Sequence, residues 1–303
     1  MKNVFLTGAT GYLGSAVAEK LKSRGFKVTG LARNPASAAQ LEKKGAAAVL
    51  GELADLELLK NAAKGSDAVV HTAFDHSGDY SANAKLDRDA INAFGEALAG
   101  TDKPLVVTST SAILADTRTI QADEDYPFDP ASSRVLRGES ERDIQQMSQK
   151  SVRAIALRFP LFIYGGGGSL FLPFMIEQAK KTGSANYIGR GDQIVSAIHV
   201  EDAAELFVAV LETSTAKGVY NAATESLTLK ELNESIARLL HLKAKSITAE
   251  RAREEFGPVY EFLSKSNQLS AEKVIRETEW SPSAFRKIED DIENGSYRKF
   301  QEQ

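Results

Sequence analysis

Short apolar runs alternate with amphipathic stretches along the first half of the chain. The apolar runs cover residues 2–7, 27–32, 47–50, 67–72 and 104–109, and helical patterns lie between them, from Ser15 and at about 37–44, 56–63 and 80–99. Parallel strands are buried on both faces, so they read as continuous apolar runs, and helices form their crossovers. The pattern predicts an α/β fold, a doubly wound parallel sheet that binds ligands at the carboxyl ends of its strands.

The second half of the chain is less regular. It predicts a helix over 138–149, a strand over 152–158, a flexible break at the glycines 165–168, helices over 171–181 and 201–211, and a helix-rich segment at the C-terminal end. We expect a nucleotide-binding domain over 1–165, to which 193–223 return. A smaller, mostly helical cap over 166–192 and 224–303 would bind the substrate.

The first apolar run opens directly into a glycine-rich turn, Gly8-Ala9-Thr10-Gly11-Tyr12-Leu13-Gly14, and then into a helix. In such a turn, Gly8 permits the sharp bend, Gly11 lets the backbone approach a phosphate, and Gly14 lets the helix pack closely. The free N–H groups at the helix N-terminus favour an anion. This segment therefore predicts a dinucleotide site that includes Thr10, Tyr12 and Leu13; the alternative is a turn with packing glycines only.

The residue after the second strand indicates which dinucleotide binds. An acid there favours NAD, whereas a cation receives the 2′-phosphate of NADP. Here Arg33 takes that place, so we expect NADP rather than NAD, unless Arg33 is only a solvated surface charge. After the third strand, Glu52 and Leu53 stand where an acid can accept a hydrogen bond from the adenine amino group; a solvated loop acid is the equal alternative.

Composition excludes several classes of protein. The 303 residues hold 37 Lys and Arg against 41 Asp and Glu, with a net charge of −4, and no basic block indicates nucleic acid or a membrane surface. Cysteine is absent, which excludes disulfides and thiolate catalysis. No His and acid spacing predicts a metal site. We expect a cytoplasmic protein, monomeric or homodimeric, that binds a small-molecule substrate.

Several further motifs resemble the extended and atypical short-chain dehydrogenase/reductase superfamily. They follow the glycine turn at 65–73, 107–112, 157–165, 198–204 and 218–221. The resemblance implies a Rossmann fold with a nicotinamide cofactor and places Thr72, Ala73, Phe74 and Pro160 beside that cofactor. None of these motifs is specific for a substrate.

The resemblance also implies catalytic positions, and here the chain departs from the family. Ser111 matches the serine that hydrogen-bonds the reacting oxygen. The family's Tyr-x-x-x-Lys pair falls on Ser133 and Arg137, aligned by Glu141. Arg137 can still hold a ribose, but an arginine is a poor proton relay and a serine is a weak acid. Tyr126, His76, Tyr164 or a water chain could donate the missing proton.

The sequence thus predicts an NADP-dependent oxidoreductase that reduces a small carbonyl compound, or oxidises the alcohol, by hydride transfer. The lost tyrosine and lysine leave a second hypothesis, a sensor or regulator that binds NADP(H) without turnover. A nucleotide-sugar epimerase is a third, weakened because such enzymes usually use that tyrosine as a base. Fold-level analogy does not choose among the three.

Overall fold

Seven parallel strands form the central sheet of the computed structural model, which describes residues 2–149, 152–283 and 286–301. The strand order is β10-β6-β5-β4-β1-β2-β3. The strands are β1 (Asn3–Thr7), β2 (Lys27–Ala32), β3 (Ala47–Leu50), β4 (Ala68–His71), β5 (Pro104–Thr110), β6 (Arg153–Phe159) and β10 (Gly218–Asn221). Because β1 pairs with both β2 and β4, the strand order reverses there, and the glycine turn follows β1 at this point.

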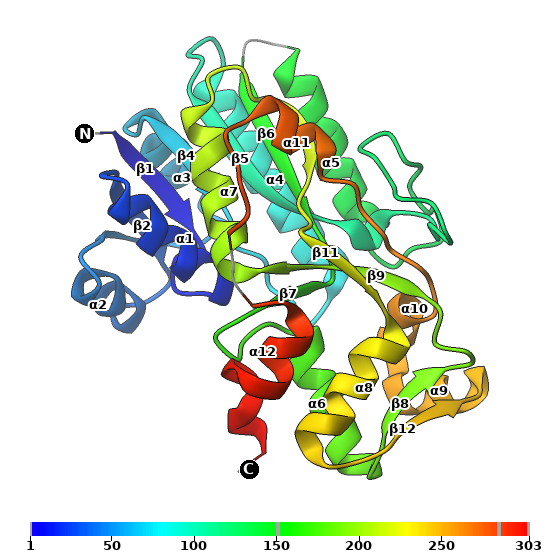
Figure 1. Ribbon diagram of the computed structural model, residues 1–303. Coiled ribbons are helices and arrows are strands. Elements are labelled where there is room, and N and C mark those ends of the chain that lie inside the picture. Colours follow the sequence, from blue (N-terminus) through cyan, green and yellow to red (C-terminus); the bar gives the residue numbers. More distant parts are fainter. Residues whose placement is uncertain (1, 150–151, 284–285, 302–303) are drawn as a thin grey trace.

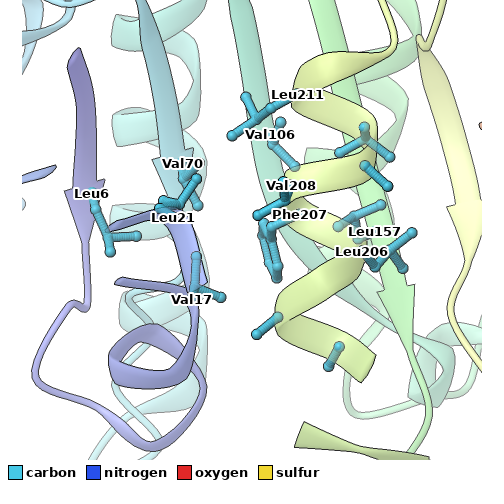
Figure 2. Close-up of a cluster of buried hydrophobic side chains, with 14 of the residues drawn as sticks. Leu6, Val17, Leu21, Val70, Val106, Leu157, Leu206, Phe207, Val208 and Leu211 are labelled. Atoms are coloured by element: carbon cyan, nitrogen blue, oxygen red, sulfur yellow. The ribbon is translucent and has the colours of Figure 1, made fainter. Parts of the chain in front are cut away.

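Helices cover both faces of this sheet (Figure 1). They are α1 (Tyr12–Ser23), α2 (Pro35–Lys43), α3 (Leu56–Lys64), α4 (Tyr80–Leu98), α5 (Val135–Ser148) and α7 (Val200–Glu212). On one face, Val17 and Leu21 of α1 and Leu206 of α7 pack against Leu6 and Val106 (Figure 2). On the other face, α3, α4 and α5 bury a second apolar cluster. The expected doubly wound sheet is confirmed.

Most of the remaining elements form a smaller part of the molecule, below the sheet in Figure 1, whereas α11 (Glu272–Glu277) lies beside the large sheet, with its Val274 in the same apolar cluster as α1 and α7. A three-stranded sheet joins β7 (Phe162–Tyr164), β9 (Ile194–His199) and β11 (Glu225–Thr228), and a two-stranded sheet joins β8 (Ala185–Ile188) to β12 (Ala244–Ile247). The helices of the smaller part are α6 (Phe171–Thr182), α8 (Leu229–Leu240), α9 (Ala249–Phe256), α10 (Tyr260–Leu263) and α12 (Ile288–Asn294). Short 3₁₀ turns are η1 (Ser111–Ile113), η2 (Gly257–Val259) and η3 (Ser296–Phe300).

The segment 193–223 divides between the two parts of the molecule. Its first strand, β9, pairs with β7 and β11, whereas α7 packs on the large sheet and β10 extends that sheet beside β6. A separate apolar cluster holds α6, α8, α9, α10 and α12 together. The exact domain limits stay a prediction. Within the described ranges, no helix is both long enough and apolar enough to cross a membrane.

Candidate active site

In the glycine turn after β1, the backbone of α1 approaches the backbone of the turn closely. Gly8 has a φ of +72°, and its carbonyl accepts a hydrogen bond from the N–H of Gly11 at 2.9 Å. A Cβ at Gly14 would lie 2.1 Å from that same carbonyl oxygen. The first turn of α1 therefore packs directly on the glycine turn, with its N–H groups free for an anion. This geometry fits the diphosphate of a dinucleotide.

A pocket of about 420 Å³ opens beside this turn, at the carboxyl ends of the strands. It runs from the glycine turn past the ends of β4 and β5 to α6 and α10. Of the predicted cofactor and catalytic residues, the pocket is lined by Gly8, Gly11, Tyr12, Leu13, Gly14, Thr72, Phe74, Arg137 and Pro160. Most of the predicted site residues therefore lie at the carboxyl ends of the strands, where a doubly wound sheet binds its ligands.

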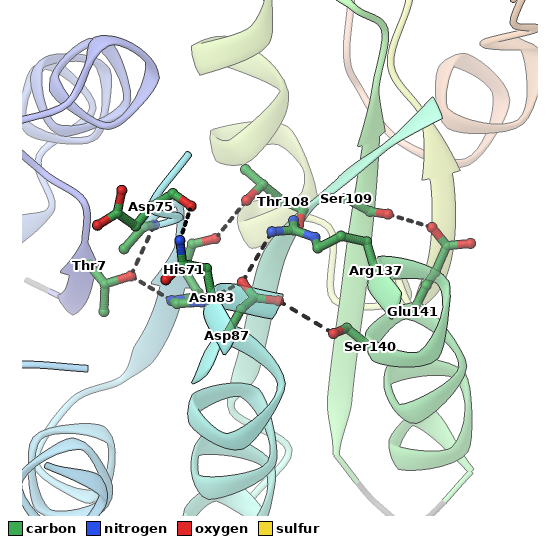
Figure 3. Close-up of polar contacts among 11 residues, drawn as sticks. Thr7, His71, Asp75, Asn83, Asp87, Thr108, Ser109, Arg137, Ser140 and Glu141 are labelled. Atoms are coloured by element: carbon green, nitrogen blue, oxygen red, sulfur yellow. Dashed lines mark hydrogen bonds and ion pairs between the residues drawn. The ribbon is translucent and has the colours of Figure 1, made fainter. Parts of the chain in front are cut away.

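Arg137 joins a chain of buried polar side chains beneath the pocket. Its guanidinium donates to Asp87 at 3.2 Å and to the carbonyl of Thr108, and it lies 4.4 Å from the centre of the Phe74 ring. Asp87 also accepts from His71, 3.2 Å away, and the other ring nitrogen of His71 lies 2.6 Å from the Thr7 hydroxyl. Figure 3 shows this chain crossing from β1 to α5.

The charge on Asp87 is set by this chain. Burial alone would raise the pKa of Asp87, but the Arg137 charge and the hydrogen bonds from His71 and Ser140 hold it below its usual range. An ionised Asp87 can only accept hydrogen bonds, so His71 donates to it through Nε2, while His71 Nδ1 lies 2.6 Å from the Thr7 hydroxyl. Arg137 is thereby fixed in position, and its charge is largely balanced.

We expect Asp87 to make stability pH-dependent. Because its pKa is lower in the folded state, the carboxylate stabilises the protein above its unfolded pKa of about 3.9, and this stabilisation is lost as pH falls through the folded value. Urea unfolding of the wild type and of Asp87→Asn between pH 7 and pH 3 measures it. The gap between the two should narrow toward acid pH; a constant gap would show that the charge of Asp87 does not contribute.

Two further pocket groups are neutral near pH 7. Partial burial, and then the charges of Arg137 and Arg134, lower the pKa of His76. Burial raises the pKa of Tyr80, although both arginines act in the opposite direction. The buried Tyr80 hydroxyl has no hydrogen-bond partner of regular geometry among the described residues. The pocket thus holds a phenol and an imidazole with unused hydrogen-bonding capacity.

Two of the three predicted catalytic residues lie outside this pocket. Ser111 is fully buried; its hydroxyl donates to Asn267, whose amide returns a bond to the Ser111 carbonyl at 2.9 Å. Ser133 is exposed, and its backbone N–H donates to Glu261 at 3.0 Å. Only Arg137 of the three lines the pocket. Thr110, immediately before Ser111, lines it instead.

The outer cofactor contacts predicted from the sequence also lie beyond the pocket. Arg33, Glu52 and Thr10 are exposed, while Leu53 and Ala73 are half-buried. Arg33 lies close enough to Asp75 to lower the pKa of that carboxyl, after the larger effect of hydrogen bonds from Ser77. These residues remain predictions for the adenosine end of the cofactor.

Of the alternative proton donors, two lie outside the pocket and one lines it. Tyr126 donates to the carbonyl of Asp116 at 3.0 Å, and Tyr164 donates to that of Arg286 at 2.9 Å, so both phenols are engaged outside the pocket. His76 lines the pocket. The sequence interpretation missed Thr110, Tyr80 and Arg134, which also line it. The one available indication for Tyr80 was its place at the start of the helix after the fourth strand.

The glycine run 165–168 leads into Ser169 and Leu170, which line the pocket, and is held from two sides. Tyr12, in the first turn of α1, donates through its hydroxyl to the Gly165 carbonyl at 2.8 Å. From η3, Tyr297 donates to the Gly168 carbonyl at 2.8 Å, and Ser296 accepts from the Gly167 N–H at 2.8 Å. The run is therefore held in place next to the pocket by α1 and η3 and is not the flexible break that the sequence predicts.

Comparisons with known proteins agree with this geometry. Residues 4–223 match the family described as "NAD dependent epimerase/dehydratase family". An uncharacterized protein of Schizosaccharomyces pombe is 36% identical over 282 residues, 92% of this chain and 95% of the relative. A 4-hydroxy-2-methyl-3-oxo-4-farnesyl-3,4-dihydroquinoline-1-oxide ketoreductase of Stigmatella aurantiaca is 29% identical over 224 residues, 71% and 66% of the two chains.

Solved structures show the same fold at low identity. The dTDP-glucose 4,6-dehydratase of Bacillus anthracis, solved in complex with NAD, has a TM-score of 0.77 and 20% identity, over 100% of this chain and 98% of that one.

Proposed function

Because this chain belongs to the NAD-dependent epimerase/dehydratase family, we propose that it is an NADP-dependent oxidoreductase that reduces a small carbonyl compound or oxidises the corresponding alcohol. The observation that carries the proposal is that one pocket joins the glycine turn to Arg137 and to the ends of β4 and β5. The ketoreductase relative supports a reductase rather than an epimerase.

The residues of this chain have separate tasks in the proposed reaction. The glycine turn and the first turn of α1 would hold the diphosphate, and Arg137, fixed by Asp87, would hold the ribose. Reduced nicotinamide, when bound, supplies a hydride to the carbonyl carbon and is left oxidised. Negative charge then builds on the carbonyl oxygen, and a hydroxyl beside it stabilises that charge by donating a hydrogen bond. The proton that completes the alcohol would come from solvent.

We assign that hydroxyl to Thr110. It lies in the pocket at the end of β5, one residue before Ser111, and its oxygen accepts only a long bond of 3.2 Å from the N–H of Ala112. Its proton is therefore available to a ligand. Ser111, in contrast, uses its proton on Asn267.

The test begins with binding and then measures turnover. Calorimetry should detect NADPH, and NADPH consumption should follow with members of a panel of aldehydes and ketones. NADPH binding without turnover on the panel would reject the enzyme and favour the sensor, which the exposure of Ser133 at the family's tyrosine position also favours. Absence of NADPH and NADH binding would reject both.

Thr110→Val is expected to lower kcat by about a hundredfold, because the developing oxyanion loses its donor. The affinity for NADPH should not change, and Thr110→Ser should restore most of the rate. Ser111→Ala should instead lower the midpoint of thermal unfolding with little effect on kcat. The reverse pattern, with a folded Ser111→Ala protein that is inactive, would return the role to Ser111.

Arg33→Ala is expected to weaken NADPH binding by about ten- to a hundredfold, the value of a hydrogen-bonded charge. NADH has no 2′-phosphate, so its affinity should not change. Arg190 is a suitable control, since it is an exposed arginine paired with Asp192 in the turn before β9. Equal losses for both coenzymes would exclude a 2′-phosphate contact.

A further inference from the structure

Two arginines line the pocket, and Arg134 differs from Arg137 in having no ion-pair partner among the described residues. It is the N-cap residue of α5, half-buried, and its guanidinium carbon lies 4.0 Å from the centre of the Tyr80 ring and 5.3 Å from that of Phe262. Within residues 2–149, 152–283 and 286–301, no carboxylate forms an ion pair with it. Arg137, by contrast, is paired with Asp87.

In the part of the chain that the structure describes, the pocket lining offers Arg134 no counter-ion, and the acid nearby in the fold, Glu261, accepts its hydrogen bond from the N–H of Ser133 at 3.0 Å. None of the described residues that line the pocket is an Asp or a Glu. His76 and Tyr80 are neutral near pH 7, since their pKa values are shifted down and up respectively. A partly desolvated cation without a counter-ion costs free energy, and an oxyanion that enters the pocket recovers it. The planar guanidinium suits two oxygens at once.

The walls around Arg134 are apolar. Phe171 of α6 and Phe262 of α10 meet edge to face, with ring centres 6.0 Å apart, and Leu161 and Leu170 line the same pocket. A ligand held here would place an anionic group on Arg134 and a hydrophobic body against these rings. Such a pocket is suited to amphiphilic molecules rather than to neutral sugars.

We propose that Arg134 binds the anionic group, a carboxylate or a phosphate, of an amphiphilic carbonyl substrate. This inference rests on the proposed function for the carbonyl, but the anion site itself does not depend on turnover. Because the site lies beyond Arg137, at the α10 end of the pocket, it is separate from the glycine turn. Arg134 is therefore expected to determine which substrates are accepted while leaving the cofactor affinity unchanged.

The test measures binding by calorimetry, with and without saturating NADP⁺. The probes are 3-phenylpropanoate, phenyl phosphate and the neutral 3-phenylpropanamide. In the wild type, at least one of the two anions should bind at least ten times more tightly than the amide. The anion that binds more tightly shows whether the site prefers a carboxylate or a phosphate. In Arg134→Gln this preference should disappear, and Arg134→Lys should restore part of it.

Arg142→Gln is the matched control, because Arg142 lies on the same helix, 5.1 Å from the Phe128 ring, and pairs with Glu139 outside the pocket. It should keep the full preference for anions. NADPH affinity should remain within twofold in all three variants. Wild type that binds the amide as well as the anions, or binds none of the probes, would overturn the proposal, as would loss of NADPH binding in Arg134→Gln. Absence of NADPH binding in the wild type would instead reject only the proposed function.

Where turnover is found, paired substrates extend the test. 4-Formylbenzoate and its methyl ester differ in the charged group alone. Arg134→Gln should lower kcat/KM for the acid by at least tenfold, mainly through KM, and leave the ester unchanged. Equal effects on both substrates would show a merely structural role for Arg134.

Discussion

Glu141→Ala is expected to lower the free energy of unfolding by about 3–5 kcal/mol, because it leaves the charge of Arg158 buried and unpaired. Both side chains have 0% exposure. Arg158 Nε lies 3.3 Å from a Glu141 oxygen that also accepts from the Ser109 hydroxyl at 2.6 Å. A domain has only about 5–15 kcal/mol of stability in total, so this single change removes a large part of it.

The measurement is urea unfolding followed by circular dichroism. Glu57→Ala is the control, because Glu57 forms an exposed ion pair with Lys60 and should change stability by less than about 0.5 kcal/mol. The double variant Glu141→Leu/Arg158→Met should recover part of the loss, since it removes both charges together. A double variant less stable than Glu141→Ala would mean that the bonds from Arg158 to the carbonyls of Asp123 and Glu124 contribute more than its charge balance.

Gly14→Ala is expected to weaken NADPH binding by about a hundredfold, because a displacement of about 1 Å is enough to spoil such a site. The new Cβ would lie 2.1 Å from the Gly8 carbonyl oxygen and 2.7 Å from the Thr72 hydroxyl. Neither the backbone of the glycine turn nor α1 can absorb this contact without moving apart. Overpacking of this kind also costs about 1–3 kcal/mol of stability.

Calorimetry with NADPH measures the affinity, and thermal unfolding measures the stability. Gly65→Ala is the control: Gly65 ends α3 with a φ of −75°, and a Cβ there would meet its nearest atom at an ordinary 3.5 Å. It should bind NADPH as the wild type does. Undiminished affinity in Gly14→Ala would mean that the glycine turn does not hold the diphosphate.

Much of the central sheet could be predicted because its strands are buried on both faces. The run over 27–32 matches β2 residue for residue, and 47–50 matches β3. The first helix begins at Tyr12 rather than Ser15, because Gly11 is already its N-cap. β7 and β12, which lie outside the large sheet, were not predicted, since their short runs carry no clear period and do not belong to the regular alternation of strands and helices.

The site was predictable to the extent that it is local in sequence. The glycine turn depends on contiguous residues, whereas the catalytic constellation depends on contacts between distant ones. Asn267 turns the Ser111 hydroxyl away from the pocket across 156 residues of sequence. The position of Arg134 between Tyr80 and Phe262 likewise exists only after α4, α5 and α10 have packed. No local pattern encodes either arrangement.

The hydrogen bonds of Tyr297 and Ser296 to the glycine run have a consequence for biosynthesis. The nucleotide layer from β1 to β6 can assemble while the ribosome is still translating the rest of the chain. The loop is fastened only when residues 296 and 297 have left the ribosome. The nascent polypeptide can therefore gain much of its sheet early, but the glycine run is fixed only after Ser296 and Tyr297 have been made.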